Sequence, residues 1–137
     1  MDRTNIQPIP PEATWPIRQQ VLWPNRPMEY VQLPDDSQGL HFGLWTAHQL
    51  VSVISLFITE ESAQFRKFAT LEAEQGKGYG SQLLHRVIQE ARQRGLQQLW
   101  CNARADKVAF YERFGLQATE KTFVKGGINY IILRTNL

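Results

Sequence analysis

The chain is organised around the run Gln75-Gly76-Lys77-Gly78-Tyr79-Gly80. It follows a short, mostly apolar run at residues 65–71, which is typical of a buried strand. The glycines indicate a turn, because glycine adopts backbone conformations that other residues avoid and lets a ligand approach the main chain closely. The sequence therefore predicts a strand that leads directly into a glycine-rich turn.

A helix is predicted to begin within this turn. Gly95 ends it, and Arg92 and Arg94 lie in its last turn, where cations suit the helix dipole. Its apolar residues recur at the spacing of one helix face: Tyr79, Leu83, Leu84, Val87, Ile88 and Ala91. Free N–H groups and the positive end of the dipole meet where a helix begins, so the turn is predicted to bind an anion such as a phosphate.

Length and composition limit the class of protein. The 137 residues predict one domain over residues 1–137, and 42% hydrophobic with 20% charged residues is ordinary for a globular chain. The net charge is only +2 and the basic residues are scattered, which argues against a nucleic-acid partner. Cys101 is the only cysteine, so we expect neither an intramolecular disulfide nor a metal site. No apolar run approaches the ~20 residues of a membrane span and no signal peptide is evident, so we expect a cytoplasmic protein without a membrane partner.

The other elements predict an α/β domain with a mixed sheet. We expect a helix at residues 12–23 and a short helix that Asp106 caps and Gly115 ends. Residues 47–49 and 126–127 are predicted to be turns. Further strands are predicted at residues 4–9, 30–33, 40–45, 50–58, 96–101, 116–124 and 129–133. The first of these can be at most a short edge strand, because prolines interrupt it.

Three kinds of glycine-rich phosphate site can be compared with the turn. A Walker A loop, G-x-x-x-x-G-K-[ST], is excluded because Leu71 stands at its first glycine and Gly78 at its Ser/Thr. A dinucleotide fingerprint, G-x-G-x-x-G, fits poorly because Ser81 occupies its last glycine and no acidic residue follows the next strand to hold a ribose. The pattern Q/R-x-x-G-x-G/A is met by Gln75, Gly78 and Gly80.

The second half of the chain carries another pattern. Leu99-Trp100-Cys101-Asn102-Ala103-Arg104 is followed by Phe110-Tyr111-Glu112-Arg113-Phe114-Gly115, with Leu116 next. Together with the turn, these residues resemble the GNAT N-acetyltransferase superfamily, whose strand with an asparagine precedes an "FYxxxGF" helix; Leu116 replaces the last phenylalanine. The resemblance covers roughly residues 40–133, and Val21-Leu22-Trp23-Pro24 is similar to a segment of a bacterial subgroup. It implies a single domain with a mostly antiparallel sheet of six to seven strands flanked by helices.

The resemblance implies that acetyl-CoA is the cosubstrate. In the family, main-chain amides of the glycine turn hold the CoA pyrophosphate, which here implies Gln75, Gly76, Lys77, Gly78, Tyr79 and Gly80, with Ser81 close behind. The preceding strand would pair with the pantetheine arm at Phe68, Ala69 and Thr70, and one of its N–H groups would polarise the thioester carbonyl. The side chain of Lys77 either adds charge to this site or is simply solvated.

Two residues of the second motif are candidates for direct roles. Asn102 either hydrogen-bonds the pantetheine or the helix start, or is an ordinary turn asparagine. The resemblance implies that Tyr111 donates a proton to the departing CoA thiolate; the other interpretation is an aromatic core residue. Proton donation is chemically feasible, because the phenol pKa of ~10 is close to the thiol pKa of ~8.5.

The general base is not evident from the sequence. The candidates are Glu60, Glu61, Glu72, His41 and a chain of water molecules, and His41 is equally well explained as a hydrogen-bonded structural histidine. Cys101 lies among strand residues, which indicates a buried structural thiol and not a nucleophile.

The acceptor is expected to be selected by the N-terminal helix, the loop at residues 24–27, residues 60–64 and the final hairpin. Several aromatic residues either line that cleft or belong to the core: Trp15, Trp23, Trp45, Phe123 and Tyr130. The subgroup is expected to have a histidine before the aromatic residue of the last strand, where this chain has Asn129.

The sequence thus predicts an N-acetyltransferase that moves an acetyl group from acetyl-CoA to a primary amine by direct attack in a ternary complex. The acceptor is a small molecule or a peptide, and the resemblance is compatible with a homodimer. The alternative is a non-catalytic CoA-binding regulatory module, which the presence of Asn102 and Tyr111 argues against.

Overall fold

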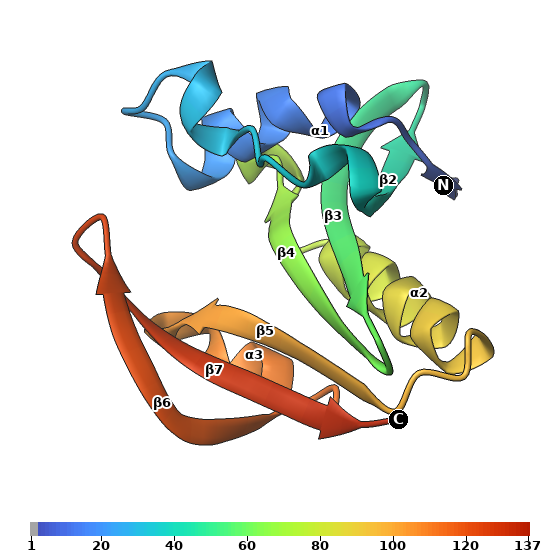
Figure 1. Ribbon diagram of the computed structural model, residues 1–137. Coiled ribbons are helices and arrows are strands. Elements are labelled where there is room, and N and C mark those ends of the chain that lie inside the picture. Colours follow the sequence, from blue (N-terminus) through green and yellow to red (C-terminus); the bar gives the residue numbers. More distant parts are fainter. Residues whose placement is uncertain (1–2) are drawn as a thin grey trace.

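Residues 3–137 are described in a computed structural model, shown in Figure 1. Seven strands form one sheet in the order β1-β2-β3-β4-β5-β7-β6. The strands are β1 (Thr4–Pro8), β2 (Leu40–Thr46), β3 (Gln49–Thr59), β4 (Ser62–Thr70), β5 (Gln98–Arg104), β6 (Gln117–Lys125) and β7 (Ile128–Asn136). Neighbouring strands are antiparallel except β4 and β5, which are parallel. This confirms the predicted mixed, mostly antiparallel sheet.

The helices are short except for one. They are α1 (Pro11–Ile17), the π-helix η1 (Arg18–Leu22), α2 (Tyr79–Gln93), α3 (Val108–Glu112) and the 3₁₀ turns η2 (Met28–Val31), η3 (Asp36–Gln38), η4 (Glu72–Glu74) and η5 (Ala105–Lys107). Among the helices of residues 3–137, none combines the length and the apolar character needed to cross a bilayer.

The long helix α2 packs against the sheet through the face that the sequence predicts. All six residues of that face are buried, and they join the apolar side chains of β2, β3, β4 and β5 in the main core. The helix ends as predicted at Gly95, whose positive φ of 74° suits glycine. The burial of this face places the N-terminus of α2 at the end of β4, which is where the glycine turn lies.

The N-terminal segment covers the other side of the first half of the sheet. The predicted helix at residues 12–23 is present but changes from α to π geometry after Ile17. Arg18 in this segment is fully buried and forms an ion pair of 2.8 Å with Asp36, which lies just before β2. The pair fixes the segment above β3, since Arg18 also donates a hydrogen bond to Ser55 on that strand.

Two predictions of local structure are wrong. The strand expected at residues 30–33 is absent: residues 30–31 belong to the 3₁₀ turn η2 and residues 32–33 form a loop. The carbonyl of Val31 accepts a hydrogen bond from Arg18 and joins no sheet ladder. The helix expected to be capped by Asp106 begins at Val108, and it has no side-chain cap. The preceding residues form the tighter turn η5, which moves the helix start past Asp106.

The sheet opens in its middle. Figure 1 shows β4 and β5 meeting near the C-terminus and then diverging, so that the first four strands and the last three form the two sides of a V. The N-terminal helices lie above one side and the turn between β6 and β7 lies at the end of the other. A cleft lined by residues of both sides lies between them.

Candidate active site

The cleft begins where β4 and β5 separate. The two strands are in register only from Ser62 to Gln64, opposite Gln98 to Trp100. Beyond that point a cleft of about 870 Å³ opens, and residues 65–70 of β4 have no strand on their β5 side. An extended ligand can therefore add to this edge as if it were another strand. Phe68, Ala69 and Thr70, which the sequence predicts as pantetheine contacts, all line the cleft.

A β-bulge in β4 shapes the middle of the cleft. Val53 on β3 pairs with Ala69 and Ser55 pairs with Arg66, so Ile54 lies opposite both Lys67 and Phe68. Lys67 has a positive φ of 55°, which is uncommon for a residue with a side chain. The bulge re-aims the side chains on both sides of it and brings Lys67 into the cleft lining. Sequence reasoning missed it, although apolar residues at 65 and 68 break the two-residue alternation of a regular strand.

The glycine turn presents main-chain N–H groups to the same cleft. Gly76 and Gly78 have φ of 80° and 83°, and a Cβ at either position would meet nothing within 4 Å. Within residues 3–137, the N–H groups of Gly76, Gly78, Tyr79, Gly80 and Ser81 find no hydrogen-bond acceptor. Such a set of free donors at the start of a helix is suited to an anion.

The turn is held against the end of β4. The side-chain amide of Gln75 donates a hydrogen bond of 2.9 Å to the carbonyl oxygen of Thr70. Gly80 allows close contact, since a Cβ there would lie 3.2 Å from the ring of Phe68 and 3.4 Å from the hydroxyl of Thr70. The ammonium of Lys77 lies 2.9 Å from a carboxylate oxygen of Glu74. Of the predicted turn residues, all except Lys77 line the cleft.

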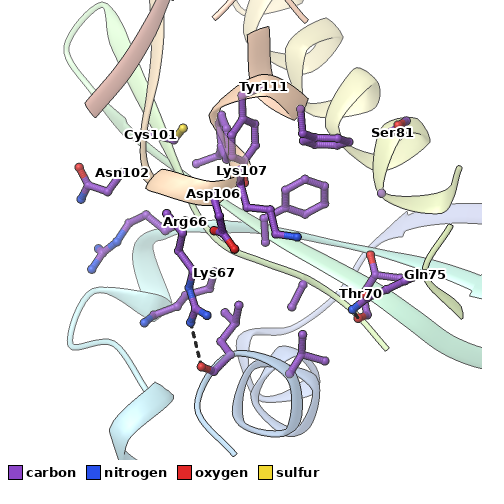
Figure 2. A pocket seen from close by; sticks show the side chains of 18 of the residues that line it. Arg66, Lys67, Thr70, Gln75, Ser81, Cys101, Asn102, Asp106, Lys107 and Tyr111 are labelled. Carbon is purple, nitrogen blue, oxygen red and sulfur yellow. Dashed lines mark hydrogen bonds between the residues drawn. The ribbon is translucent and has the colours of Figure 1, made fainter. Parts of the chain in front are cut away.

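Tyr111 on α3 lies over the middle of the cleft, where Figure 2 shows it between the glycine turn and the far end. Its ring packs against Phe65 and Phe68 of β4 at centroid distances of 5.6 and 6.4 Å. Its hydroxyl has no hydrogen-bond partner in the described part of the chain. Burial, with a smaller effect of Cys101, raises the pKa of the phenol above its ordinary value, and Arg104 opposes this. The residue thus keeps its proton at neutral pH.

The two ends of the cleft differ in chemistry. Figure 2 shows Thr70, Gln75 and Ser81 at one end, which is the glycine turn, and Arg66, Lys67, Asn102 and Asp106 at the other. Asn102 is an exposed residue within β5 and pairs in register with Ile132 of β7. Its predicted contact with the cofactor stays a prediction. Its neighbour Cys101 is buried and burial raises its thiol pKa to about 12, as expected of a structural thiol.

None of the side chains predicted as candidate bases lines the cleft. His41 is buried, with its ring nitrogens 2.6 Å from the Ser55 hydroxyl and 2.7 Å from the carbonyl oxygen of Asp36. Glu60, Glu61 and Glu72 lie outside the lining as well. The carboxylates that do line it are Glu74 at the turn and Asp106 at the other end.

The far end of the cleft holds cations that the sequence did not single out, contributed by three strands: Arg66, Lys67, Arg104 and Lys125. Burial first, and then the charges of Lys125, Arg18, Arg66 and Arg104, lower the pKa of Lys67 to about 8. No sequence signal could have grouped these residues, because they are separated by up to 59 positions and are brought together only by the sheet.

Three of the predicted aromatic residues line this far end, namely Trp23, Phe123 and Tyr130, whereas Trp15 and Trp45 do not. Phe123 and Tyr130 stack at 5.1 Å with an interplanar angle of 9°. Within the described residues, no group of three His, Cys, Asp or Glu side chains is placed to hold a metal.

Comparison with known proteins agrees with this geometry. Residues 20–137 match the family model described as "Acetyltransferase (GNAT) domain". The chain is 30% identical over 142 residues to YitI of Bacillus subtilis, an uncharacterized N-acetyltransferase. The aligned region covers 96% of this chain and 95% of the relative.

Solved structures share the fold. A putative N-acetyltransferase from Lactobacillus plantarum has a TM-score of 0.84 and 22% identity, covering 99% of this chain and 98% of the other. A GNAT family acetyltransferase from Elizabethkingia anophelis, solved with acetyl-CoA bound, has a TM-score of 0.75 and 18% identity and covers 98% of both chains. The family match spans most of the chain and includes both sequence motifs. The chain therefore belongs to the GNAT family of N-acetyltransferases, acyltransferases that depend on acetyl-CoA.

Proposed function

We propose that this protein transfers the acetyl group of acetyl-CoA to a primary amine by direct attack within a ternary complex. The observation that carries the proposal is the unpaired edge of β4 that ends at the free N–H groups of the glycine turn. The CoA pyrophosphate would bind residues 75–81, and the pantetheine arm would pair with Phe68, Ala69 and Thr70. The thioester then lies near the bulge of β4, under Tyr111.

The reaction needs charge stabilisation at one oxygen and a proton at the sulfur. As the amine attacks, negative charge develops on the thioester oxygen, and an N–H group of the β4 edge would donate a hydrogen bond to it. As the carbon–sulfur bond breaks, Tyr111 would give its proton to the departing thiolate. Its hydroxyl supports this role, because within residues 3–137 no other group holds the proton. The raised pKa keeps the phenol protonated over the neutral range but makes it a weaker acid than an ordinary tyrosine.

The base that takes the proton from the amine would lie at the far end of the cleft. Asp106 is the carboxylate at that end, and Figure 2 shows it among the side chains of the lining. It replaces the candidates from the sequence, since Glu60, Glu61, Glu72 and His41 lie outside the lining. Asp106 would accept the proton directly or through a water molecule.

The proposal is tested by incubating the protein with acetyl-CoA and a panel of primary amines. Released thiol and the mass of the acetylated amine are both measured. We expect thiol release that depends on the amine and matches the product formed. Tight CoA binding by calorimetry with no turnover on any amine would instead support the non-catalytic CoA-binding module.

A further inference from the structure

We infer that the acceptor carries a negatively charged group, a carboxylate or a phosphate, beside its amine, and that Lys67, Arg104 and Lys125 bind that group. The inference rests on the proposed function, because it concerns the second substrate of the same cleft. It narrows the class of acceptor from any primary amine to an amine that also carries an anionic group. Three observations carry it: the position of these cations, their lack of acidic partners and the aromatic surface beside them.

The cations gather at the end of the cleft away from the glycine turn. Arg104 lies opposite Tyr130 in the β5–β7 pair, and Tyr130 lies opposite Phe123 in the β7–β6 pair. Residues opposite one another in antiparallel strands share a face, so these three side chains form a row across the sheet. Lys125 lies two positions beyond Phe123 on the same face. Lys67 approaches from β4 on the other side of the cleft.

We call the far end of the cleft, with Lys67, Arg104 and Lys125, the recess. The charges of these three residues have no acidic partner among residues 3–137. Arg66 has a partner in Asp35, with a closest distance of 3.4 Å. In the described part of the chain, Lys67, Arg104 and Lys125 make no ion pair with any carboxylate. Asp106 is the acidic side chain at this end of the lining, so three unpaired cations face one carboxylate. A simple cationic amine would be repelled here, whereas an amine with an anionic group would be attracted.

Part of the recess is preorganised. Arg104 donates a hydrogen bond of 2.8 Å to the carbonyl oxygen of Leu22, and its guanidinium lies 5.4 Å from the ring centre of Trp23. This contact crosses from β5 to the N-terminal segment. A guanidinium fixed in this way keeps other N–H donors for a ligand, because it has five in all.

The phosphates of CoA do not account for these cations. Their predicted place is the glycine turn, at the opposite end of the cleft in Figure 2. The stacked rings of Phe123 and Tyr130, with Trp23 across the recess, offer a surface for the apolar stem of a second substrate. The recess therefore has what an anionic amine with an apolar or aromatic stem requires.

The test compares two acceptors that differ in one charge, benzylamine and 4-(aminomethyl)benzoate. The kcat/KM for each is measured at pH 7 with saturating acetyl-CoA. We expect the carboxylate to raise kcat/KM by about tenfold or more, as one charge-assisted contact does, and the ratio to fall at high salt. 4-(Aminomethyl)phenyl phosphate in the same assay distinguishes a phosphate from a carboxylate acceptor.

Two variants test whether the recess causes the preference for 4-(aminomethyl)benzoate over benzylamine, measured as the ratio of their kcat/KM values. Lys125→Gln and Lys67→Gln should each lower the ratio about tenfold, with an unchanged Kd for CoA by calorimetry. Lys121→Gln is the matched control, because it removes the same charge from β6 at a position outside the cleft lining, and it should leave the ratio unchanged.

Failure of the inference is distinguishable from failure of the proposed function. Equal kcat/KM for the neutral and the anionic amine would overturn the inference and leave an active acetyltransferase. Loss of CoA affinity in Lys125→Gln and Lys67→Gln would also overturn it, since these residues would then bind the cofactor. Absence of turnover with every amine would overturn the proposed function itself.

Discussion

Gln64 on β4 lies opposite Trp100 on β5, and this pair is the last at which the two strands are in register. Every residue of β4 beyond Gln64 has a partner strand on one side only. The glycine turn comes immediately after this free edge, so the edge and the turn form one continuous binding surface. The parallel arrangement matters here, because it puts the C-terminal ends of both strands at the open side of the V.

Hydrogen exchange should report binding at this edge directly. We expect the amides of residues 65–70 that face the cleft to exchange rapidly in the free protein and to become about tenfold or more protected with CoA, because each gains a main-chain partner. The amides of β3 between Val51 and Leu56 already lie in a paired strand and serve as the internal control. Protection confined to residues 75–81 would contradict pairing of the pantetheine arm with β4.

Tyr111→Phe removes the proposed proton donor and keeps the ring that packs on Phe65 and Phe68. We expect kcat to fall by ~10–10³ while the Kd for acetyl-CoA stays nearly constant, as for loss of a general acid. Tyr30→Phe is the matched control, because it removes a phenol hydroxyl outside the cleft lining. An unchanged kcat with a good acceptor would remove Tyr111 from the mechanism.

Gly78→Ala separates backbone strain from cofactor binding. Gly78 and Gly127 have nearly equal φ, 83° and 79°, and a Cβ at either would meet nothing within 4 Å. Both alanine variants should therefore lose about 1–2 kcal/mol of unfolding free energy, measured by urea denaturation. Only Gly78→Ala should weaken CoA, by about tenfold, because its methyl group occupies the space above the free N–H groups of the turn. Equal CoA affinity in both variants would argue against the turn as the pyrophosphate site.

The acceptor preference should depend on pH through Lys67. Its pKa is lowered to about 8, first by burial and then by neighbouring cations, so it is charged below pH 8 and neutral above. The ratio of kcat/KM for 4-(aminomethyl)benzoate to that for benzylamine should therefore fall as the pH rises from 7 to 9. Using the ratio removes the titration common to both amines. Lys67→Arg should flatten this profile, because a guanidinium stays protonated over the whole range; a profile that keeps its slope would point to another group.

Asp36→Asn should destabilise the fold by ~3–5 kcal/mol in urea denaturation at pH 7, because it leaves the fully buried Arg18 without its counter-charge. Asp35→Asn is the control from the adjacent position, and it should cost less than about 1 kcal/mol since its pair with Arg66 is partly exposed.

The same pair predicts an acid limit of stability. Burial alone raises the pKa of Asp36, but hydrogen bonds from Arg18, Leu33 and Trp15 outweigh it and hold the pKa below the ordinary 3.8. A lowered folded-state pKa means that the stabilisation is present above pH ~3.8 and is lost as the pH falls through the folded value. Thermal melts from pH 7 down to about pH 2 should show this loss in the wild type below pH ~3.8, and Asp36→Asn should lack it.

Local signals account for what could be predicted. The face of α2 and the stops at Gly95 and Gly115 follow from spacing and from glycine conformation, and both depend only on near neighbours in the chain. The strand expected at residues 30–33 is wrong because its pattern was judged without Arg18, thirteen positions before Val31, which takes that residue's carbonyl.

The glycine turn, the helix that follows it and the family motif around Tyr111 are each encoded in a continuous stretch, so they can be recognised without the fold. The separation of β4 from β5, the bulge at Lys67 and the recess shared by Lys67, Arg104 and Lys125 become visible only in the folded chain. Strand pairing and charge clustering join residues that are far apart in sequence. Their spacing along the chain therefore carries no information about their spacing in the fold.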